Sequence, residues 1–407
     1  MNTIYFARYI YLESGEILLN GAVSVSGNRI VDVAPRGRIK RNRNDRVVNL
    51  GNLLLLPGFI NMHTHLEECV ARGSTKEPNE TFTKFLQQKN RRVQETPEEV
   101  KLASMRLNVR ELLAEGVTSV VDSSSSQLSL NILKEENIRS WVISEIHDNS
   151  TKIVLPQLNE SDRNREKNLF MSSGIGPHAL FSLTPQKQKK IINFTYENDC
   201  IWMTHLAESS EELQAFSEQS GDLFSHMTEK KEWPFKNSPH GSAHHAIRHN
   251  LIPSNGICIH CNYLNGHELT LLAAKRISVV LCNQYTQMMN HKSFPLEVAL
   301  NRGVSICLGT EGVAAAGEMS LFDELFSLRM AHPHIPAREM LKWVTTNPAA
   351  ALRMSEHLGS ISPGKLADII GVRFAYDTSQ DLLEEMLMED PEIQFVLIDG
   401  EEVIVNY

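Results

Sequence analysis

Short apolar runs recur along the middle of the chain, and signals for helices occupy the stretches between them. Runs of aliphatic and β-branched residues of this length predict buried strands. Helix starts are indicated at residues 209–212 and 347–348, and at 96–99, where Thr96 would be the N-cap, Pro97 the first helical residue and Gly116 the end. The eight apolar runs lie at residues 53–62, 118–121, 140–146, 173–180, 200–205, 256–261, 278–282 and 305–309.

Eight strands that alternate with helices predict an α/β fold, a (β/α)8 barrel of the TIM type. The competing fold is a doubly wound open sheet, which carries a glycine-rich turn after its first strand. No such turn follows the first apolar run. In a barrel the C-terminal ends of all strands meet at one mouth, so polar residues at those ends indicate the chemistry.

The first apolar run ends in His63-Thr64-His65. Alternate side chains of a strand point to the same face, so both imidazoles face the same way and suit a metal ion. The short pattern alone is equally compatible with two polar residues where a strand leaves the core. The other predicted strand ends carry His178, His205 with Glu208 close behind, His260 and Glu311. Three imidazoles and one carboxylate suit a zinc or ferrous ion with a position left open for water.

Five segments resemble the amidohydrolase superfamily, in the branch that includes adenosine-type, guanine and methylthioadenosine/S-adenosylhomocysteine deaminases and chlorohydrolases. They lie in the order of that family and together span the chain. Residues 57–65 read Pro-Gly-Phe-Ile-Asn-Met-His-Thr-His, and residues 204–208 read Thr-His-Leu-Ala-Glu. Residues 259–261, 308–311 and 359–368 complete the set.

Within this branch the chain is most similar to the aminofutalosine deaminases of menaquinone biosynthesis. The resemblance lies in residues 63–67 followed by 82–86, in 205–213, and in the Asn-Ser-Pro segment at 237–239. These enzymes convert the adenine of 6-amino-6-deoxyfutalosine to hypoxanthine and release futalosine and ammonia. The resemblance therefore implies hydrolytic deamination at C6 of an adenine ring.

The resemblance also implies a role for each candidate residue. A single divalent ion, zinc or iron(II), is expected, since the fourth strand lacks the lysine that bridges two metals in other members. The ion would activate a water for attack on C6. Glu208 would protonate ring N1 and help a proton reach the departing amine, and His260 would stabilise the tetrahedral species. The implied ligands are His63, His65, His205 and Glu311, and the implied substrate contacts are Glu67, His178 and Phe181.

Two departures from the family pattern leave alternatives open. Glu311 stands where the family has an aspartate that is both ligand and base, and Cys282-Asn283-Gln284-Tyr285 stands where relatives carry Cys-Pro-Arg-Ser-Asn. Catalysis is sensitive to misplacement on the order of 1 Å, so the longer carboxylate matters. A methylthioadenosine/S-adenosylhomocysteine or other aromatic-ring aminohydrolase, a chlorohydrolase, and a degenerate nucleoside-binding relative remain as alternatives.

The two ends of the chain have another character. Residues 1–56 and 360–407 contain short alternating strands, which relatives pair into one small β-sandwich beside the barrel of residues 57–359. Cys258 and Cys261 are spaced as C-x-x-C, but three residues apart on a strand they should face opposite ways and belong to the core.

Net charge and hydropathy limit the kinds of partner that the chain can bind. A net charge of −9 argues against a nucleic-acid role, since polyanion binding needs a basic face. No apolar run approaches the length of a membrane span, and the six cysteines lack the spacing of a disulfide framework. We therefore expect a cytoplasmic enzyme that acts on a small nucleoside, with a homodimer left open as its assembly.

Overall fold

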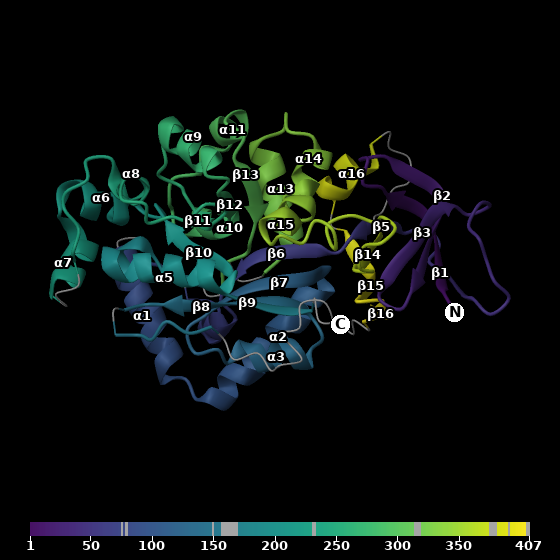
Figure 1. The fold of residues 1–407 in the computed structure, drawn as a ribbon, viewed down its shortest axis with the longest axis horizontal. Coiled ribbons are helices and arrows are strands. Elements are labelled where there is room, and N and C mark those ends of the chain that lie inside the picture. The colour runs from purple at the N-terminus through teal and green to yellow at the C-terminus, as the bar shows by residue number, and fades with distance from the viewer. Residues whose placement is uncertain are drawn as a thin grey trace.

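The computed structural model describes residues 1–74, 76–77, 80–148, 150–155, 170–229, 233–312, 319–373, 381–389 and 391–403. Eight parallel strands follow one another in chain order around a barrel (Figure 1). Hydrogen bonds from the Thr310 and Glu311 amides to the His63 carbonyl, each 3.1 Å, close it between the last strand and the first. The predicted (β/α)8 barrel is confirmed. Its strands are β6 (Phe59–Thr64), β7 (Val117–Ser124), β8 (Arg139–Ile146), β9 (Met171–Pro177), β10 (Ile201–Leu206), β11 (Ile257–His260), β12 (Ser278–Leu281) and β13 (Ser305–Leu308).

Alternation along these strands separates two apolar layers. Val121, Ile143 and Met203 pack with one another inside the barrel. Their chain neighbours Val120 and Val142 pack with the surrounding helices instead. Because both faces of each strand are buried, the strands appear in the sequence as continuous apolar runs.

The first apolar run is not one strand. It divides at Gly58 into β5 (Leu54–Pro57), which belongs to a second sheet, and β6, which belongs to the barrel. A Cβ on Gly58 would lie 2.1 Å from Thr118 Oγ1, so the close approach of β6 to β7 requires glycine here. The expectation of a single strand over residues 53–62 is therefore wrong in its first half.

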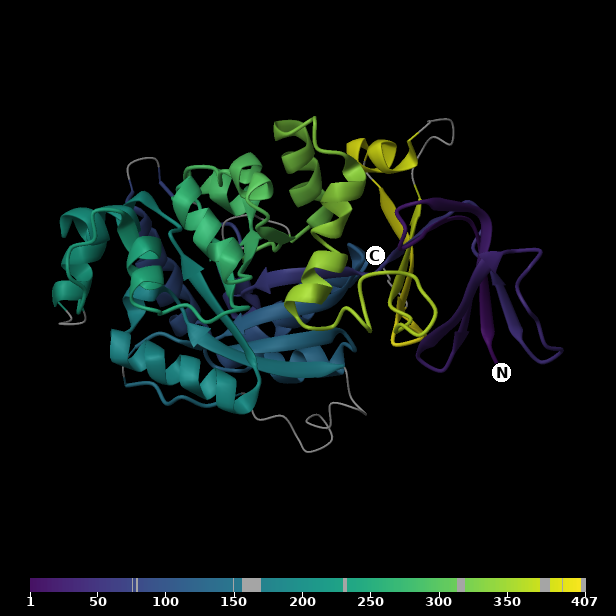
Figure 2. The same ribbon diagram turned by 45° about the horizontal axis from the view of Figure 1, so that its top comes forward.

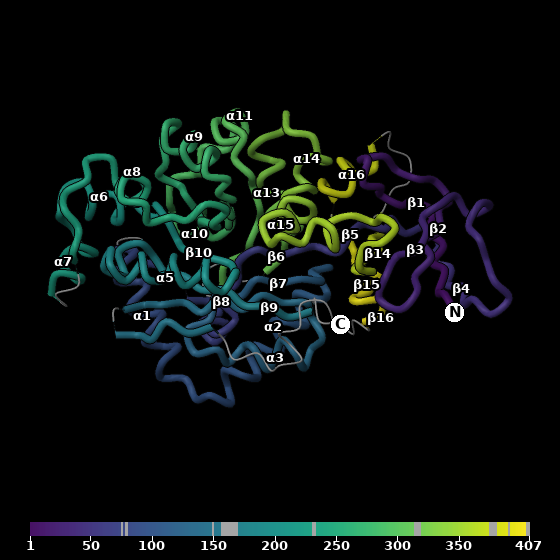
Figure 3. Tube along the Cα trace, viewed as in Figure 1, coloured from purple at the N-terminus to yellow at the C-terminus, as the bar shows by residue number. Residues whose placement is uncertain are grey.

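Helices surround the barrel, as the tube in Figure 3 also shows. Short 3-10 turns, η1 (Leu66–Ala71) and η2 (Leu180–Ser182), follow two of the strands. The helices are α1 (Phe82–Glu95), α2 (Glu98–Ala114), α3 (Ser129–Glu135), α5 (Pro185–Asn198), α6 (Ser210–Glu218), α7 (Gly221–Glu229), α8 (Gly241–Arg248), α9 (Gly266–Ala274), α10 (Asn283–Met288), α11 (Leu296–Asn301), α13 (Leu321–Ala331), α14 (Ala337–Lys342), α15 (Thr346–Ala351) and α16 (Leu382–Met388).

Of the predicted helix starts, the one at Ser209 is confirmed and the one at Thr96 is not. Ser209 caps α6 and its side chain accepts from the Glu212 amide, as expected. Thr96 instead closes α1, and its hydroxyl donates to the Arg92 carbonyl at 2.7 Å. The N-cap of α2 is Pro97, which makes no side-chain cap hydrogen bond. The two helices are separated by only two residues. Thr96, which the pattern assigns to the start of α2, therefore lies at the end of α1.

Strands from both ends of the chain form the second, mixed sheet (Figure 2). Its order is β16-β15-β14-β5-β1-β2-β3, with β4 also paired to β1. Tyr5 in β1 contacts Phe395 in β15 with ring centroids 5.2 Å apart, although β5 and β14 separate these strands in the order. The sheet therefore folds over its own apolar face. Its strands are β1 (Thr3–Tyr11), β2 (Ile17–Ser26), β3 (Arg29–Pro35), β4 (Arg46–Asn49), β14 (Ile369–Arg373), β15 (Glu392–Ile398) and β16 (Glu401–Glu402).

This arrangement confirms a barrel with a second β-structure built from both chain ends. The division into 1–56 plus 360–407 and 57–359 stays a prediction, as do the cytoplasmic location and the homodimer. Among the described residues, no helix combines the length and the hydropathy that a membrane crossing requires.

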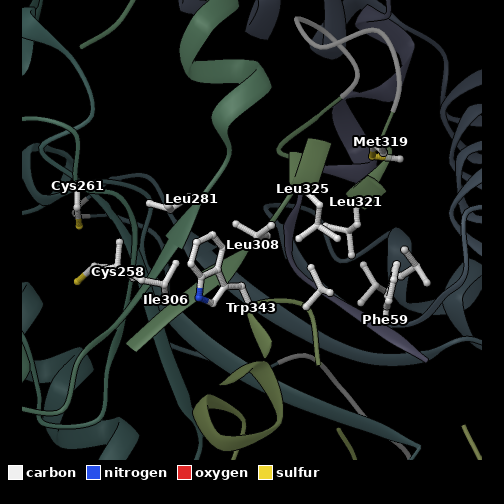
Figure 4. Packing of buried hydrophobic residues seen from close by; sticks show 14 of the residues in the cluster. Phe59, Cys258, Cys261, Leu281, Ile306, Leu308, Met319, Leu321, Leu325 and Trp343 are labelled. Atoms are coloured by element: carbon white, nitrogen blue, oxygen red, sulfur yellow. The ribbon is translucent and has the colours of Figure 1, made fainter. Parts of the chain in front are cut away.

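Packing between the barrel and its helices is dense around Trp343 (Figure 4). This side chain is fully buried beside Ile306 and Leu308 of β13, and its carbonyl accepts from the Leu308 amide at 3.0 Å. Leu321 and Leu325 of α13 belong to the same cluster. These contacts fix the strand that leads into Glu311.

A buried ion pair joins the base of the barrel to the second sheet. Arg139, at the start of β8, donates to both carboxylate oxygens of Asp368 at 2.7 and 3.0 Å, and to Asp399 at 3.0 Å. The Arg139 side chain has no exposed surface and that of Asp368 is 3% exposed. A pair of this kind is costly to break, because the remaining charge stays buried.

We expect Arg139→Met to lower the free energy of unfolding by about 3–5 kcal/mol, since Asp368 would remain buried without its partner. Urea unfolding followed by circular dichroism measures this change. Arg106→Met is the control: the Arg106 side chain is 36% exposed beside Glu135, and this pair should contribute less than about 1 kcal/mol. Equal losses in the two variants would contradict a special role for the buried pair.

Candidate metal centre and active site

Three imidazoles and one carboxylate converge at the mouth of the barrel. His63 Nε2 lies 2.8 Å from Glu311 Oε2, and His65 Nε2 lies 3.3 Å from Glu311 Oε1. His205 Nε2 lies 3.2 Å from His63 Nε2 and 3.4 Å from His65 Nε2. The structure thus brings together the four residues that the resemblance implies as ligands, each from the end of a barrel strand.

These separations are those expected of donors that share one ion. Metal–ligand distances of about 2.0–2.1 Å place neighbouring donors about 3.3 Å apart. His205 Nδ1 donates to the His178 carbonyl at 2.6 Å, which leaves the lone pair of Nε2 directed at the cluster. The residues present therefore fit one divalent ion.

Charge at the cluster points the same way. Burial lowers the pKa of His65, but the carboxylates of Glu68, Glu311 and Glu145 outweigh it and raise that pKa to about 10. Burial lowers the pKa of His63 to about 4. The site attracts positive charge, and a divalent ion would take the place of the proton on His65.

Glu311 reaches the cluster despite its extra methylene. Its backbone lies in the left-handed region at φ 58°, which is uncommon for a residue with a Cβ. Burial raises the pKa of Glu311, but the imidazoles of His63 and His65 hold it well below the usual range. The longer side chain is therefore an ionised group among the other three donors.

His260 and Glu208 stand beside the cluster. His260 Nε2 lies 3.5 Å from Glu311 Oε2 and 3.7 Å from Glu208 Oε1. Both ring nitrogens of His260 are buried, and neither has a hydrogen-bond partner within the described part of the chain. Burial raises the pKa of Glu208 to about 8, and burial holds the pKa of His260 well below its usual value.

The segment that departs from the family pattern contributes to this pair. Tyr285 stacks on His260 with ring centroids 5.4 Å apart, and its hydroxyl interacts with Glu208. Glu324 accepts from the amides of Asn283 and Gln284, which fixes the start of α10. The sequence marks this segment as unusual, but it does not show that Tyr285 faces the site.

A cavity of about 650 Å³ opens beside the cluster, and all three residues expected to contact substrate line it. The Glu67 carboxylate already accepts from the Ser126 amide at 3.1 Å, the Ser126 hydroxyl at 2.8 Å and the Ser124 hydroxyl. His178 Nδ1 lies 3.1 Å from Glu145 Oε1. Phe181 packs partly buried against the main core. Their contacts with substrate stay predictions.

Sequence reasoning missed Glu145 and His147. Glu145 is buried near the end of β8 and its second oxygen lies 3.0 Å from His147 Nε2. The rings of His147 and His178 stack with centroids 4.7 Å apart on the cavity wall. The sequence pattern could have indicated Glu145, because this residue lies at a predicted strand end like the other candidates.

The C-x-x-C pair lies in the core, as expected, but its geometry differs. Strand β11 ends at His260, and the backbone turns left-handed at His260 (φ 65°) and Cys261 (φ 59°). This turn brings the Cys261 side chain back to Cys258, and the two interact. The expectation that they face opposite ways is wrong, because the strand ends between them. Both are buried, free cysteines in the cluster of Figure 4.

Known proteins resemble this chain over nearly its whole length. It is 22% identical over 405 residues to a 5-methylthioadenosine/S-adenosylhomocysteine deaminase of Pelotomaculum thermopropionicum, covering 95% of this chain and 88% of the relative. The structure of Helicobacter pylori aminofutalosine deaminase in complex with methylthio-coformycin superposes with a TM-score of 0.84 at 21% identity, covering 99% of this chain and all of that one. An adenosine deaminase of Xanthomonas campestris with bound zinc superposes with a TM-score of 0.82 at 19% identity, covering 98% and 92%.

The structural likenesses, at these identities, concern the fold. The family model described as the amidohydrolase family matches residues 54–403, which include the whole barrel and all the candidate ligands. This match confirms the resemblance seen in the sequence and, with it, a hydrolytic enzyme. The chain belongs to the amidohydrolase family.

Proposed function

We propose that this chain hydrolytically removes the C6 amino group from the adenine ring of a nucleoside-like substrate. The observation that carries the proposal is the position of Glu208, a carboxyl with a pKa raised to about 8, beside His260 and a four-donor metal site. The relatives named above act, by their names, on adenine nucleosides. A site of this composition suits the addition of water to an aromatic ring.

His63, His65, His205 and Glu311 would hold one divalent ion, zinc or iron(II). When bound, the ion supplies an activated water near neutral pH. Glu208 is protonated near neutral pH, so it donates to ring N1 and then helps a proton reach the departing amine. His260, whose Nε2 lies 3.7 Å from Glu208 and 3.5 Å from Glu311, stabilises the tetrahedral species at C6.

Our best candidate for the substrate is 6-amino-6-deoxyfutalosine, which would yield futalosine and ammonia in menaquinone biosynthesis. The structural likeness to aminofutalosine deaminase and the sequence segments at 63–67 and 82–86 support it. The second candidate is a methylthioadenosine/S-adenosylhomocysteine deaminase, which the curated relatives favour. The cavity of about 650 Å³ has room for a nucleoside with a substituent in either case.

A substrate panel separates these candidates. We expect loss of the adenine absorption band and release of ammonia with 6-amino-6-deoxyfutalosine at the highest kcat/KM. Faster turnover of methylthioadenosine or S-adenosylhomocysteine would keep the deaminase and change its substrate. Turnover of chlorinated or methylthio-substituted triazines alone would indicate hydrolysis of another leaving group. Binding of every adenine compound without turnover would indicate a degenerate site.

Metal content provides a second prediction. We expect about one zinc or iron ion per chain after reconstitution, since four donors converge on one point. His205→Ala should lose most of the ion and the activity together, as measured by elemental analysis and ammonia release. His334→Ala is the matched control, because its side chain is 61% exposed. An ion retained by His205→Ala would contradict the proposed ligand set.

Glu311→Asp tests the departure from the family pattern. The barrel holds the Glu311 backbone in place, so a shorter carboxylate would stop on the order of 1 Å short of the cluster and cost about 100-fold in kcat. Glu297→Asp, at a side chain that is 57% exposed, should leave kcat unchanged. If only the aspartate variant were active, glutamate would be a defect and the parent chain a degenerate enzyme.

A further inference from the structure

A buried ion pair lies beside the candidate metal centre, and the proposed reaction does not use it. Lys89 Nζ donates to Glu68 Oε2 at 2.5 Å, and the two side chains are 5% and 16% exposed. Glu68 belongs to η1, which begins directly after His65, whereas Lys89 belongs to α1. The pair therefore joins the turn after two candidate ligands to the next helix.

Glu68 faces the same space as the candidate ligands. Its side chain lines the cavity together with His65 and Glu208. Its Oε2 lies 3.6 Å from the position that a Cβ on Gly312 would take, directly after Glu311. Carboxylate oxygens ligate zinc and iron readily. A Glu68 carboxylate released from Lys89 would thus be a candidate to compete for the ion.

The Lys89 ammonium stays charged beside the Glu68 carboxylate although burial disfavours its charged form. Burial lowers the pKa of Lys89, but the carboxylates of Glu68, Glu311 and Glu208 outweigh it and raise that pKa. On the same helix, the Lys84 side chain is 64% exposed, and its Nζ lies 4.0 Å from Asp222. Lys89 is therefore a cation that contacts Glu68 and interacts electrostatically, at longer range, with Glu311 and Glu208.

The helix that carries Lys89 is itself held in place. Glu211, at the start of α6, accepts from the amides of Phe82 and Thr83 at the start of α1. Thr81 caps α1 and its hydroxyl donates to Asp222 of α7 at 2.8 Å. Because α6 begins two residues after Glu208, the Lys89 ammonium is fixed relative to the segment that carries the proposed acid.

We propose that Lys89 is a positioning residue of the metal centre: it holds the Glu68 carboxylate away from the ion and so keeps one coordination position for water. The inference rests on the ligand set of the proposed function. It does not depend on which nucleoside is the substrate.

The test uses cobalt(II) in place of zinc in Lys89→Met, Glu68→Gln and the double variant. The visible absorption of protein-bound cobalt(II) depends on which groups ligate the ion. We expect Lys89→Met to show a band that differs from the parent band and a kcat lower by about tenfold or more, because the Glu68 carboxylate would take the position of the water. Glu68→Gln should retain the parent spectrum, and the double variant should recover the parent spectrum and most of the activity, since no carboxylate remains to be held.

Lys89→Arg keeps the positive charge and should retain the parent spectrum, and Lys84→Met is the matched exposed control on the same helix. A parent-like spectrum in Lys89→Met would overturn the inference. A double variant as impaired as Lys89→Met would also overturn it, because the effect would not pass through Glu68. Absence of deamination by every variant and by the parent would count against the proposed function alone, since the cobalt spectrum needs no substrate.

Discussion

The Glu311 carboxylate lies among the imidazoles of His63, His65 and His205 with 5% of its side chain exposed. Removing a carboxylate from water costs several kcal/mol unless positive charge and hydrogen bonds compensate it. The protein alone supplies that charge as a proton on His65, whose pKa is raised to about 10. A divalent ion offers the same compensation with shorter contacts. The electrostatics of the barrel mouth therefore favour the cation that the chemistry of the family requires.

The backbone around this carboxylate is strained at several points. Ala207, His260 and Glu311 all have left-handed φ values, between 49° and 65°, although each carries a Cβ. Such conformations cost about 1–3 kcal/mol each and persist only where the surrounding structure over-determines them. Each of these residues stands where a barrel strand ends and the chain turns toward the cavity. The closed hydrogen-bonded barrel supplies the rigidity, and the turns aim the functional side chains.

The sequence predicts the barrel well because parallel strands buried on both faces leave uninterrupted apolar runs. It also predicts that His205 and Glu311 belong to the site, because the same pattern shows where the strands end. It does not reveal the break at Gly58, which depends on Thr118 across the sheet. Lys89 was also missed, since a lysine in a helix normally indicates solvent, and its burial against Glu68 depends on how α1 docks. Contacts between distant segments are what local patterns cannot supply.

The negative charges of the carboxylates around the cavity are compensated by different neighbours. This difference indicates which carboxylate can act as the general acid. Glu67 accepts from serine donors, Glu68 from Lys89, and Glu145 lies against His147 and His178. Glu311 has the ligand imidazoles. Glu208 is faced by His260 and His291, whose pKa values burial lowers, and by a tyrosine hydroxyl. Burial, together with the carboxylates of Glu311 and Glu212, outweighs the positive charges of His205 and Lys89 and raises the pKa of Glu208 to about 8, so of these carboxylates it is the one that holds a proton to give near neutral pH.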